Sequence, residues 1–225
     1  MTEQNKWLAQ VARNPGHSQW YIERFRTMAA RGEDIVGEAR LIDAMVPRGA
    51  RILDAGCGAG RLSGYLHAAG HRVVGVDVDP ELIDAARQDY PGPEYRVADL
   101  AVLADMDLGD AFDAIVCAGN VVTFLAENTR RDVLRGFRSH LGQDGRAVVG
   151  FGAGRGYSAE EFFADAAAEG LTPQLTLAGW DVRPWSPDSE FLVTVLGAAA
   201  AFRERAAPDQ PLKRSTVSRN ASLNP

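Results

Sequence analysis

Three glycines and two acids between residues 52 and 79 have the types and the spacing of a nucleotide-cofactor site. Gly56, Gly58 and Gly60 follow a short apolar run, and glycines there let the backbone turn sharply and approach a ligand where a Cβ atom would collide. Asp54 precedes the glycines, and Asp77 ends a second apolar run. Ligands of open α/β sheets bind at the carboxyl ends of the strands. The stretch therefore predicts a strand, a glycine loop, a helix and a second strand that together hold a cofactor.

The spacing of the glycines separates two classes of cofactor. A dinucleotide fingerprint has a third glycine one position after Gly60, where it packs the helix on the strand, but this chain has Arg61 there. Asp54 would add like charge beside a pyrophosphate, whereas it suits a cationic group such as the ammonium of an amino acid. A nicotinamide-dependent oxidoreductase is therefore disfavoured. It remains an alternative, as does a cofactor-binding module without catalysis.

An acid followed by G-x-G-x-G, with a second strand that ends in an acid, resembles the motifs of the class I S-adenosylmethionine-dependent methyltransferases. The resemblance covers roughly residues 50 to 150. It implies a Rossmann-like α/β fold, in which a seven-stranded mixed sheet is mostly parallel, has an antiparallel strand at one edge and carries helices on both faces. It also implies S-adenosyl-L-methionine as the cofactor, with the glycine loop against its methionine part and Asp77 accepting both ribose hydroxyls. An ionised carboxylate offers two acceptor oxygens to two adjacent donors.

Two more strand ends complete the site that the resemblance implies. Asp99 and Leu100 follow a short strand and occupy the positions that meet the adenine, although Asp99 taken alone is typical of a turn. Asn120 follows the fourth strand beside the sulfonium, and a capping or turn role is an equal alternative for it. The expected cofactor contacts are Asp54, Gly56, Cys57, Gly58, Gly60, Asp77, Val78, Asp99, Leu100, Ala118, Gly119, Asn120 and Tyr21.

The N-terminal segment is a candidate cover for this site. Trp20, Tyr21, Phe25 and Met28 recur at helical spacing, which predicts either a helix packed on the core or a lid over cofactor and acceptor. No nucleophile or catalytic triad is visible, as expected when a sulfonium is already a good leaving group and the protein mainly aligns an acceptor and excludes water. His17 is the nearest candidate general base, useful only if the acceptor must lose a proton.

Two loops are further candidate walls of an acceptor pocket, and each could equally be an ordinary connection. One runs from Gly152 to Tyr157 and contains glycines that allow movement. The other contains Trp180, Asp181, Arg183 and Trp185. The acceptor atom, whether oxygen, nitrogen or carbon, is left open.

The length of 225 residues supports one α/β domain with additional segments at its ends. We expect a helical cap over residues 1–45, the S-adenosylmethionine-binding domain over 46–200 and a flexible tail over 204–225. Gly142 and Gly170 are expected to end two helices, and Ser158 with Glu161 predicts a capping box. The expected helices are 59–69, 81–88, 129–141 and 159–169, and the expected strands are 51–54, 73–76, 95–98, 112–117, 146–151, 173–178 and 190–197.

Composition and motif details favour a small-molecule acceptor over nucleic acid. The formal net charge is −6, whereas binding of a phosphate backbone needs clustered Lys and Arg. Asn120 is followed by two valines, whereas methyltransferases that act on base amines carry two prolines and an aromatic residue there. A local basic face could still form. Its candidate residues are four that fit a solvated helix surface, Arg130, Arg131, Arg135 and Arg138, and three in the tail, Lys213, Arg214 and Arg219.

The remaining composition points to a cytoplasmic protein without a metal or a membrane segment. No apolar stretch reaches the roughly 20 residues of a membrane span, and no signal core follows a charged N-terminal segment. Cys57 and Cys117 are interpreted as small apolar fillers rather than as a disulfide or a nucleophile. The four histidines lack metal-ligand spacing.

Overall fold

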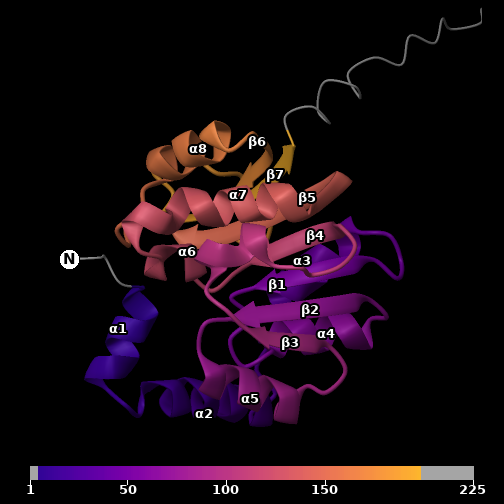
Figure 1. Ribbon diagram of the computed structural model, residues 1–225, viewed down its shortest axis with the longest axis vertical. Helices are drawn as coiled ribbons and strands as arrows, with labels where there is room; N and C mark the ends of the chain where they lie inside the picture. The colour runs from indigo at the N-terminus through magenta and orange to yellow at the C-terminus, as the bar shows by residue number, and fades with distance from the viewer. Residues whose placement is uncertain (1–4, 199–225) are drawn as a thin grey trace, which may run out of the picture.

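The computed structural model describes residues 5–198, and within them a seven-stranded sheet has the order β3-β2-β1-β4-β5-β7-β6 (Figure 1). β7 runs antiparallel to both of its neighbours, and the other pairings are parallel, so β6 and β7 form an antiparallel hairpin at one edge. The expected fold class is confirmed. The expected tail over residues 204–225 lies outside the described residues. The strands are β1 (Arg51–Ala55), β2 (Arg72–Asp77), β3 (Glu94–Val97), β4 (Phe112–Cys117), β5 (Leu141–Gly152), β6 (Leu171–Leu177) and β7 (Phe191–Ala198).

Helices cover both faces of the sheet, which explains why its central strands are almost continuously apolar. One core cluster joins α3 and α4 to the sheet through residues such as Ile42 and Leu66. The other joins α7 and α8 to the opposite face through Phe137 and Phe162. The helices are α1 (Lys6–Arg13), α2 (His17–Ala30), α3 (Gly37–Met45), α4 (Arg61–Ala68), α5 (Pro80–Asp89), α6 (Val121–Phe124), α7 (Arg130–His140) and α8 (Ala159–Ala168), with 3-10 turns η1 (Leu100–Asp105) and η2 (Glu127–Thr129).

The helix ends follow the local signals of the sequence with one exception. Ser158 and Glu161 form the capping box of α8, and Gly170 follows α8 with a φ of 73°. The expectation that Gly142 ends α7 is wrong, because Leu141 is already extended and begins β5 opposite Phe112. The chain thus passes from α7 into β5 without a left-handed turn.

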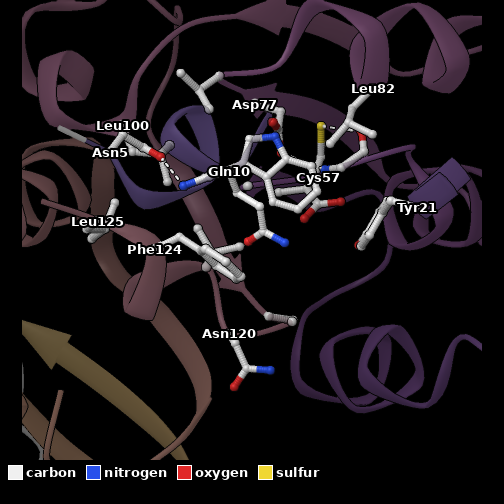
Figure 2. A pocket seen from close by; sticks show the side chains of 18 of the residues that line it. Asn5, Gln10, Tyr21, Cys57, Asp77, Leu82, Leu100, Asn120, Phe124 and Leu125 are labelled. Atoms are coloured by element: carbon white, nitrogen blue, oxygen red, sulfur yellow. Dashed lines mark hydrogen bonds between the residues drawn. The ribbon is translucent and has the colours of Figure 1, made fainter. Parts of the chain in front are cut away.

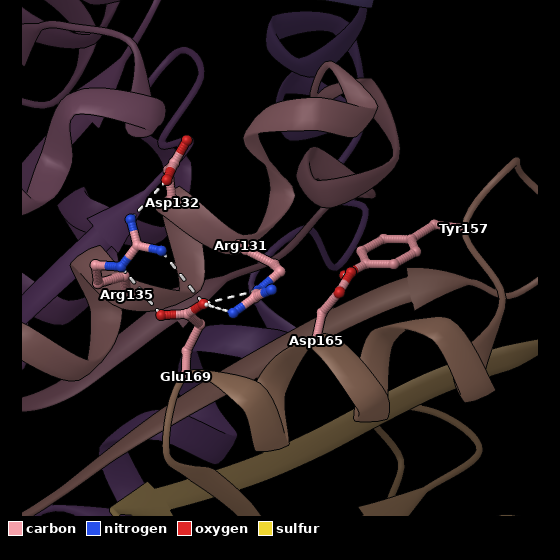
Figure 3. Close-up of polar contacts among 6 residues, drawn as sticks. All are labelled: Arg131, Asp132, Arg135, Tyr157, Asp165 and Glu169. Carbon is pink, nitrogen blue, oxygen red and sulfur yellow. Dashed lines mark hydrogen bonds and ion pairs between the residues drawn. The ribbon is translucent and has the colours of Figure 1, made fainter.

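Four of the five basic residues of α7 have partners within the protein, and two of them are drawn in Figure 3. Arg131 and Arg135 form ion pairs with Glu169, at 2.7 Å and 3.1 Å. The expectation of a solvated position is wrong for Arg130, which is 7% exposed and places its guanidinium 4.0 Å from the centre of the Tyr157 ring. This face is therefore not an open cluster of positive charge.

The N-terminal helices lie beside the sheet edge that carries β2 and β3 (Figure 1). Ile22 of α2 is buried against Leu82 and Ala85 of α5, and Tyr21 of the predicted aromatic stripe packs against this cluster. Trp20, by contrast, is 55% exposed, because it lies on another side of the helix. In residues 5–198, no helix has the length and apolarity needed to cross a bilayer.

Candidate cofactor and acceptor site

A cavity of about 340 Å³ lies at the carboxyl ends of β1, β2 and β4, where the order of the strands reverses (Figure 2). Helices α1, α2 and α6 border it. Every expected cofactor contact except Gly60 lines this cavity, and so does His17. Segments distant in the sequence therefore meet at the one place where open α/β sheets bind their ligands.

The glycine loop comes close to its surroundings, as a ligand cradle requires. Gly56 has a φ of 82°, and a Cβ atom there would lie 2.4 Å from a methyl carbon of Val121. Gly58 has a φ of 54°, and a Cβ atom there would lie 3.3 Å from the hydroxyl of Tyr21. Both positions thus need glycine for their backbone conformation, and side chains there would fill the space between the loop and its cover.

Gly60 packs against α5, and a cofactor contact for it stays a prediction. It is the N-cap of α4 with a φ of 86°, and a Cβ atom there would lie 2.8 Å from the Cβ of Ala86 in α5. The next residue, Arg61, donates two hydrogen bonds to the Glu38 carboxylate, at 2.6 Å and 2.9 Å. Gly60 therefore permits the packing of α4 on α5, and Arg61 ties α4 to α3 where a dinucleotide-binding chain would have its third glycine.

Asp77 combines a structural role with free acceptor capacity. Its carboxylate accepts hydrogen bonds from the backbone N–H groups of Gly58, at 2.9 Å, and Asp79, at 3.0 Å. An ionised carboxylate has about four acceptor sites, so two bonds leave room for two more donors. Burial raises the pKa of Asp77 to about 6, so the group is ionised at neutral pH. It fits the pair of ribose hydroxyls of an adenosyl group.

Asp54 is a second buried carboxylate on the cavity wall. It is 1% exposed and accepts a hydrogen bond from the Ser63 hydroxyl at 2.6 Å. Burial raises the pKa of Asp54 to about 6. A cationic ligand group would stabilise its ionised form. The ammonium of the methionine part of S-adenosylmethionine is such a group, so the residues present fit this cofactor.

Asp79 joins the N-terminal helices to the loop after β2. It caps α5 by accepting from the N–H of Glu81 at 2.9 Å, as its sequence position indicates. Its other oxygen accepts from the Trp7 indole N–H at 2.8 Å and from the Ser18 hydroxyl at 2.5 Å. One carboxylate, itself 4% exposed, thus attaches both α1 and α2 to the segment that carries Asp77.

Aromatic rings cover the cavity on the side of the N-terminal helices. Trp7 contacts His17, Tyr21 and Phe124, with ring centroids 5.0 Å, 5.5 Å and 5.8 Å away. All four side chains line the cavity, together with Trp20. Burial raises the pKa of Tyr21 to about 12, which keeps its hydroxyl neutral. Aromatic faces attract cations, so this cover suits a sulfonium.

His17 is held by a neighbour rather than by an acid. Its Nε2 atom lies 3.0 Å from the amide nitrogen of Gln10, and its ring stacks on Trp20 with centroids 5.4 Å apart. The Gln10 amide nitrogen can only donate, so Nε2 is the acceptor of this contact. A carboxylate that would orient the ring as a strong general base is missing from its contacts in residues 5–198.

Asp99 and Asn120 shape turns and also line the cavity. Asp99 accepts from the backbone N–H of Ala101 at 2.9 Å and so caps η1. Asn120 has a left-handed φ of 67°, and its side-chain oxygen accepts from the N–H of Gly152 at 2.8 Å. The turn interpretation is correct for both residues, and a cofactor contact for either stays a prediction.

Of the two candidate acceptor walls, only the first reaches the cavity. Arg155, in the loop after β5, lines it. Trp180 instead packs over Gly150, where a Cβ atom would lie 2.4 Å from its ring, and Trp185 lies 6.1 Å from Phe163 between ring centroids. Both tryptophans pack against the core beside β5 and α8. The structure therefore favours the alternative that the loop with Trp180 and Trp185 is an ordinary connection.

Several lining residues were not among the expected contacts. The helix α1 supplies some of them. Asn5 is the residue of the sequence that could have indicated the start of this helix, because it caps α1 by accepting from the N–H of Trp7 at 3.0 Å. The unexpected lining residues are Asn5, Trp7, Gln10, Arg24, Arg61, Leu62, Leu82, Val121, Phe124 and Leu125, whereas Trp20 and Arg155 belong to segments expected as a cover and a wall.

Neither cysteine is placed to act as a nucleophile. Cys57 and Cys117 are buried free thiols, and burial raises the pKa of both. A thiol that stays protonated is a poor nucleophile and behaves as a small apolar group. In the described part of the chain, no three His, Cys, Asp or Glu side chains are grouped as metal ligands.

Fold and site together define an α/β protein that binds a nucleotide cofactor at a topological switch point. Comparisons with known proteins identify the family. A family model described as a methyltransferase domain matches residues 52–145. A crystal structure of a TehB-like SAM-dependent methyltransferase from Corynebacterium glutamicum is 52% identical, with a TM-score of 0.78 over 82% of this chain and 100% of that one.

More distant relatives agree with this result. A ubiquinone biosynthesis O-methyltransferase of Xanthomonas axonopodis pv. citri is 31% identical over 122 residues, which are 47% of this chain and 51% of the relative. The chain thus spans about half the length of the curated relatives it matches. The SAM-bound amino pentose methyltransferase CalS10 of Micromonospora echinaspora, at 21% identity and a TM-score of 0.61 over 77% of this chain and 95% of its own, shares the fold.

The chain belongs to the S-adenosylmethionine-dependent methyltransferases, of the class I superfamily. S-adenosylmethionine is accordingly its cofactor. The prediction from the glycine and acid spacing is confirmed at the level of family, fold and cofactor.

Proposed function

We propose that this chain transfers the methyl group of S-adenosylmethionine to a small-molecule acceptor in the cavity between the sheet and the N-terminal helices. The observation that carries the proposal is the pair of buried carboxylates, Asp54 and Asp77, on either side of a glycine cradle. In this assignment Asp77 holds the ribose, Asp54 holds the ammonium, and Asp99 with Leu100 borders the adenine.

Bound S-adenosylmethionine would supply a methyl group on a sulfonium that is already a good leaving group. The protein then has to orient an acceptor in line and exclude water. The aromatic cover of Trp7, His17, Tyr21 and Phe124 suits both duties. Asn120 would border the transfer region from the end of β4, and His17 would accept a proton only from an acceptor that carries one.

The surroundings favour this function over the alternatives. The ion pair of Arg61 with Glu38 occupies the place where a nicotinamide-dependent enzyme needs a glycine. The ion pairs of Arg131 and Arg135 with Glu169 reduce the positive charge that α7 presents to nucleic acid. Two buried free cysteines are typical of a reducing compartment, so we place the protein in the cytosol. We also assign α1 and α2 as the lid of the site.

Calorimetry and a methyl-transfer assay test the proposal together. S-adenosylhomocysteine should bind, and Asp77→Asn should weaken that binding by about 2 kcal/mol because one charged acceptor oxygen becomes a donor. Asp84→Asn is the matched control, since Asp84 has a 76% exposed side chain on α5. Labelled methyl groups should then pass from the cofactor into a metabolite extract. Tighter binding of NAD would reject the function, and binding without transfer would favour a non-catalytic module.

A further inference from the structure

The acidic and basic residues that line the cavity come from different parts of the fold. The three carboxylates come from the ends of the strands or just after them, at Asp54, Asp77 and Asp99. The arginines come from elsewhere: Arg24 from α2, Arg61 from α4 and Arg155 from the loop after β5. The acids thus gather on the cofactor side, and two of the three arginines belong to segments of the lid and the opposite rim.

The three arginines differ in their partners. Arg61 is neutralised by Glu38 at 2.6 Å. In residues 5–198, neither Arg24 nor Arg155 has a carboxylate within ion-pair distance, which is 4.0 Å. Arg26, on the same helix as Arg24, pairs with Asp89 at 2.8 Å, so acids are within reach of this helix on its other side. Two exposed arginines therefore border the cavity without an ion-pair partner of their own.

Arg24 is held near the aromatic cover rather than by an acid. Its guanidinium lies 5.8 Å from the ring centre of Trp20 and 5.7 Å from that of Phe25. Trp20 and Arg24 both line the cavity, so a planar ring and a cation are presented side by side. This pairing matches a ligand that has an apolar ring and a negative group.

The cofactor makes the unpaired arginines more significant. A sulfonium is a cation, and like charges in a partly enclosed site oppose each other's binding. The carboxylates Asp54, Asp77 and Asp99 offset the cofactor's positive charge on their side of the cavity, so the two guanidinium groups leave positive charge only at the lid and the opposite rim. An anionic acceptor would offset that charge and would also gain the forked hydrogen bonds that a guanidinium offers to an oxygen anion.

We propose that the methyl acceptor is an organic anion with a planar apolar body, whose carboxylate or phosphate group is held by Arg24 and Arg155. This inference rests on the proposed function, because it assigns the acceptor of the same cavity. It names the chemical class that the cavity selects.

The test separates a metabolite extract on an anion-exchange column before the reaction. Each fraction is incubated with the protein and methyl-labelled S-adenosylmethionine. The label is expected in products of the retained fraction. Treatment of that fraction with phosphatase distinguishes the two anions, since loss of activity assigns a phosphate and its survival assigns a carboxylate.

Variants assign the residues. Arg24→Gln and Arg155→Gln should each raise the KM for the active fraction about tenfold, with the affinity for S-adenosylhomocysteine unchanged or higher. Arg72→Gln is the matched control, because Arg72 is an exposed arginine at the opposite end of β2. Transfer confined to the unretained fraction, or unchanged KM in both arginine variants, would overturn the inference and leave the proposed function standing. Absence of transfer in every fraction would instead overturn the proposed function.

Discussion

Replacing Asp79 by asparagine should release the N-terminal helices while the sheet stays folded. The side chain keeps its shape, and asparagine is as good an N-cap as aspartate, so α5 should keep its first turn. The amide, however, has one acceptor oxygen instead of two. If that oxygen stays on the N–H of Glu81, an NH₂ group faces the Trp7 indole N–H and the Ser18 hydroxyl, at the positions where the native oxygen accepts at 2.8 Å and 2.5 Å.

The expected cost follows from these contacts. Two donors cannot bond each other, so the charge-assisted bond of Trp7 is lost, at about 1.5–3 kcal/mol. The Ser18 hydroxyl can rotate to accept from the amide, which replaces a charge-assisted bond by a neutral one at a further cost of about 1 kcal/mol. The attachment of α1 and α2 should therefore weaken by about 2.5–4 kcal/mol. Ile22, buried on α5, remains to hold α2.

Hydrogen exchange of backbone amides measures this release directly. Amides of α1 should exchange at least about tenfold faster in Asp79→Asn, whereas amides of β1 and β4 should exchange as before. Asp84→Asn, on the exposed side of α5, is the control and should leave all rates unchanged. Unchanged exchange in α1 would refute the role of Asp79 as the attachment. A uniform increase throughout the sheet would show that the helices and the sheet unfold as one unit, against the reasoning above.

Two more predictions follow from the carboxylates and the glycines. Binding of S-adenosylhomocysteine should strengthen as pH rises from 5 to 7, by about tenfold for each of Asp54 and Asp77. The reason is that burial raises both pKa values to about 6, and only the ionised carboxylates are full acceptors. Calorimetry across this pH range measures the affinity, and an affinity that does not change with pH would contradict the assigned contacts. The folding stability of the free protein should change in the opposite direction. A raised pKa means that the native state binds more protons than the unfolded state between about pH 4 and pH 6. The stabilising contribution of these two groups is therefore present below about pH 4 and is lost as pH rises through 6. Gly60→Ala should lower the melting temperature with little effect on cofactor affinity, because its Cβ would lie 2.8 Å from the Cβ of Ala86. Gly58→Ala should instead lower cofactor affinity more than stability, because its Cβ would lie between the loop and Tyr21. Equal effects of the two glycine variants on both quantities would show that the two positions do not differ in role.

Local chemistry explains how much of this protein could be predicted from the sequence. The strand Phe112–Cys117 has the expected bounds, and the capping box at Ser158 is present, because both depend on neighbouring residues. The acids at Asp54 and Asp77 reach the cavity because a parallel sheet brings the carboxyl ends of its strands together.

The failures of prediction concern contacts between distant segments. The bonds of Asp79 span 72 residues to Trp7 and 61 residues to Ser18, and no local pattern indicates them. Gly60 belongs to a regular glycine spacing, yet its surroundings are set by α5. The aromatic content of the loop after β6 suggested a pocket wall, but those rings fill space over the core, which composition alone does not distinguish.

The position of Trp180 bears on how such a protein could acquire a new substrate. Since the ring of Trp180 lies over Gly150, the hairpin between β6 and β7 is fixed away from the cavity, and insertions there should be neutral for acceptor choice. Diversification would concentrate in residues 5–30, because this stretch lines the cavity without contributing a strand to the sheet. An engineer who wished to retarget the protein could exchange that short stretch with a relative's and leave the sheet untouched.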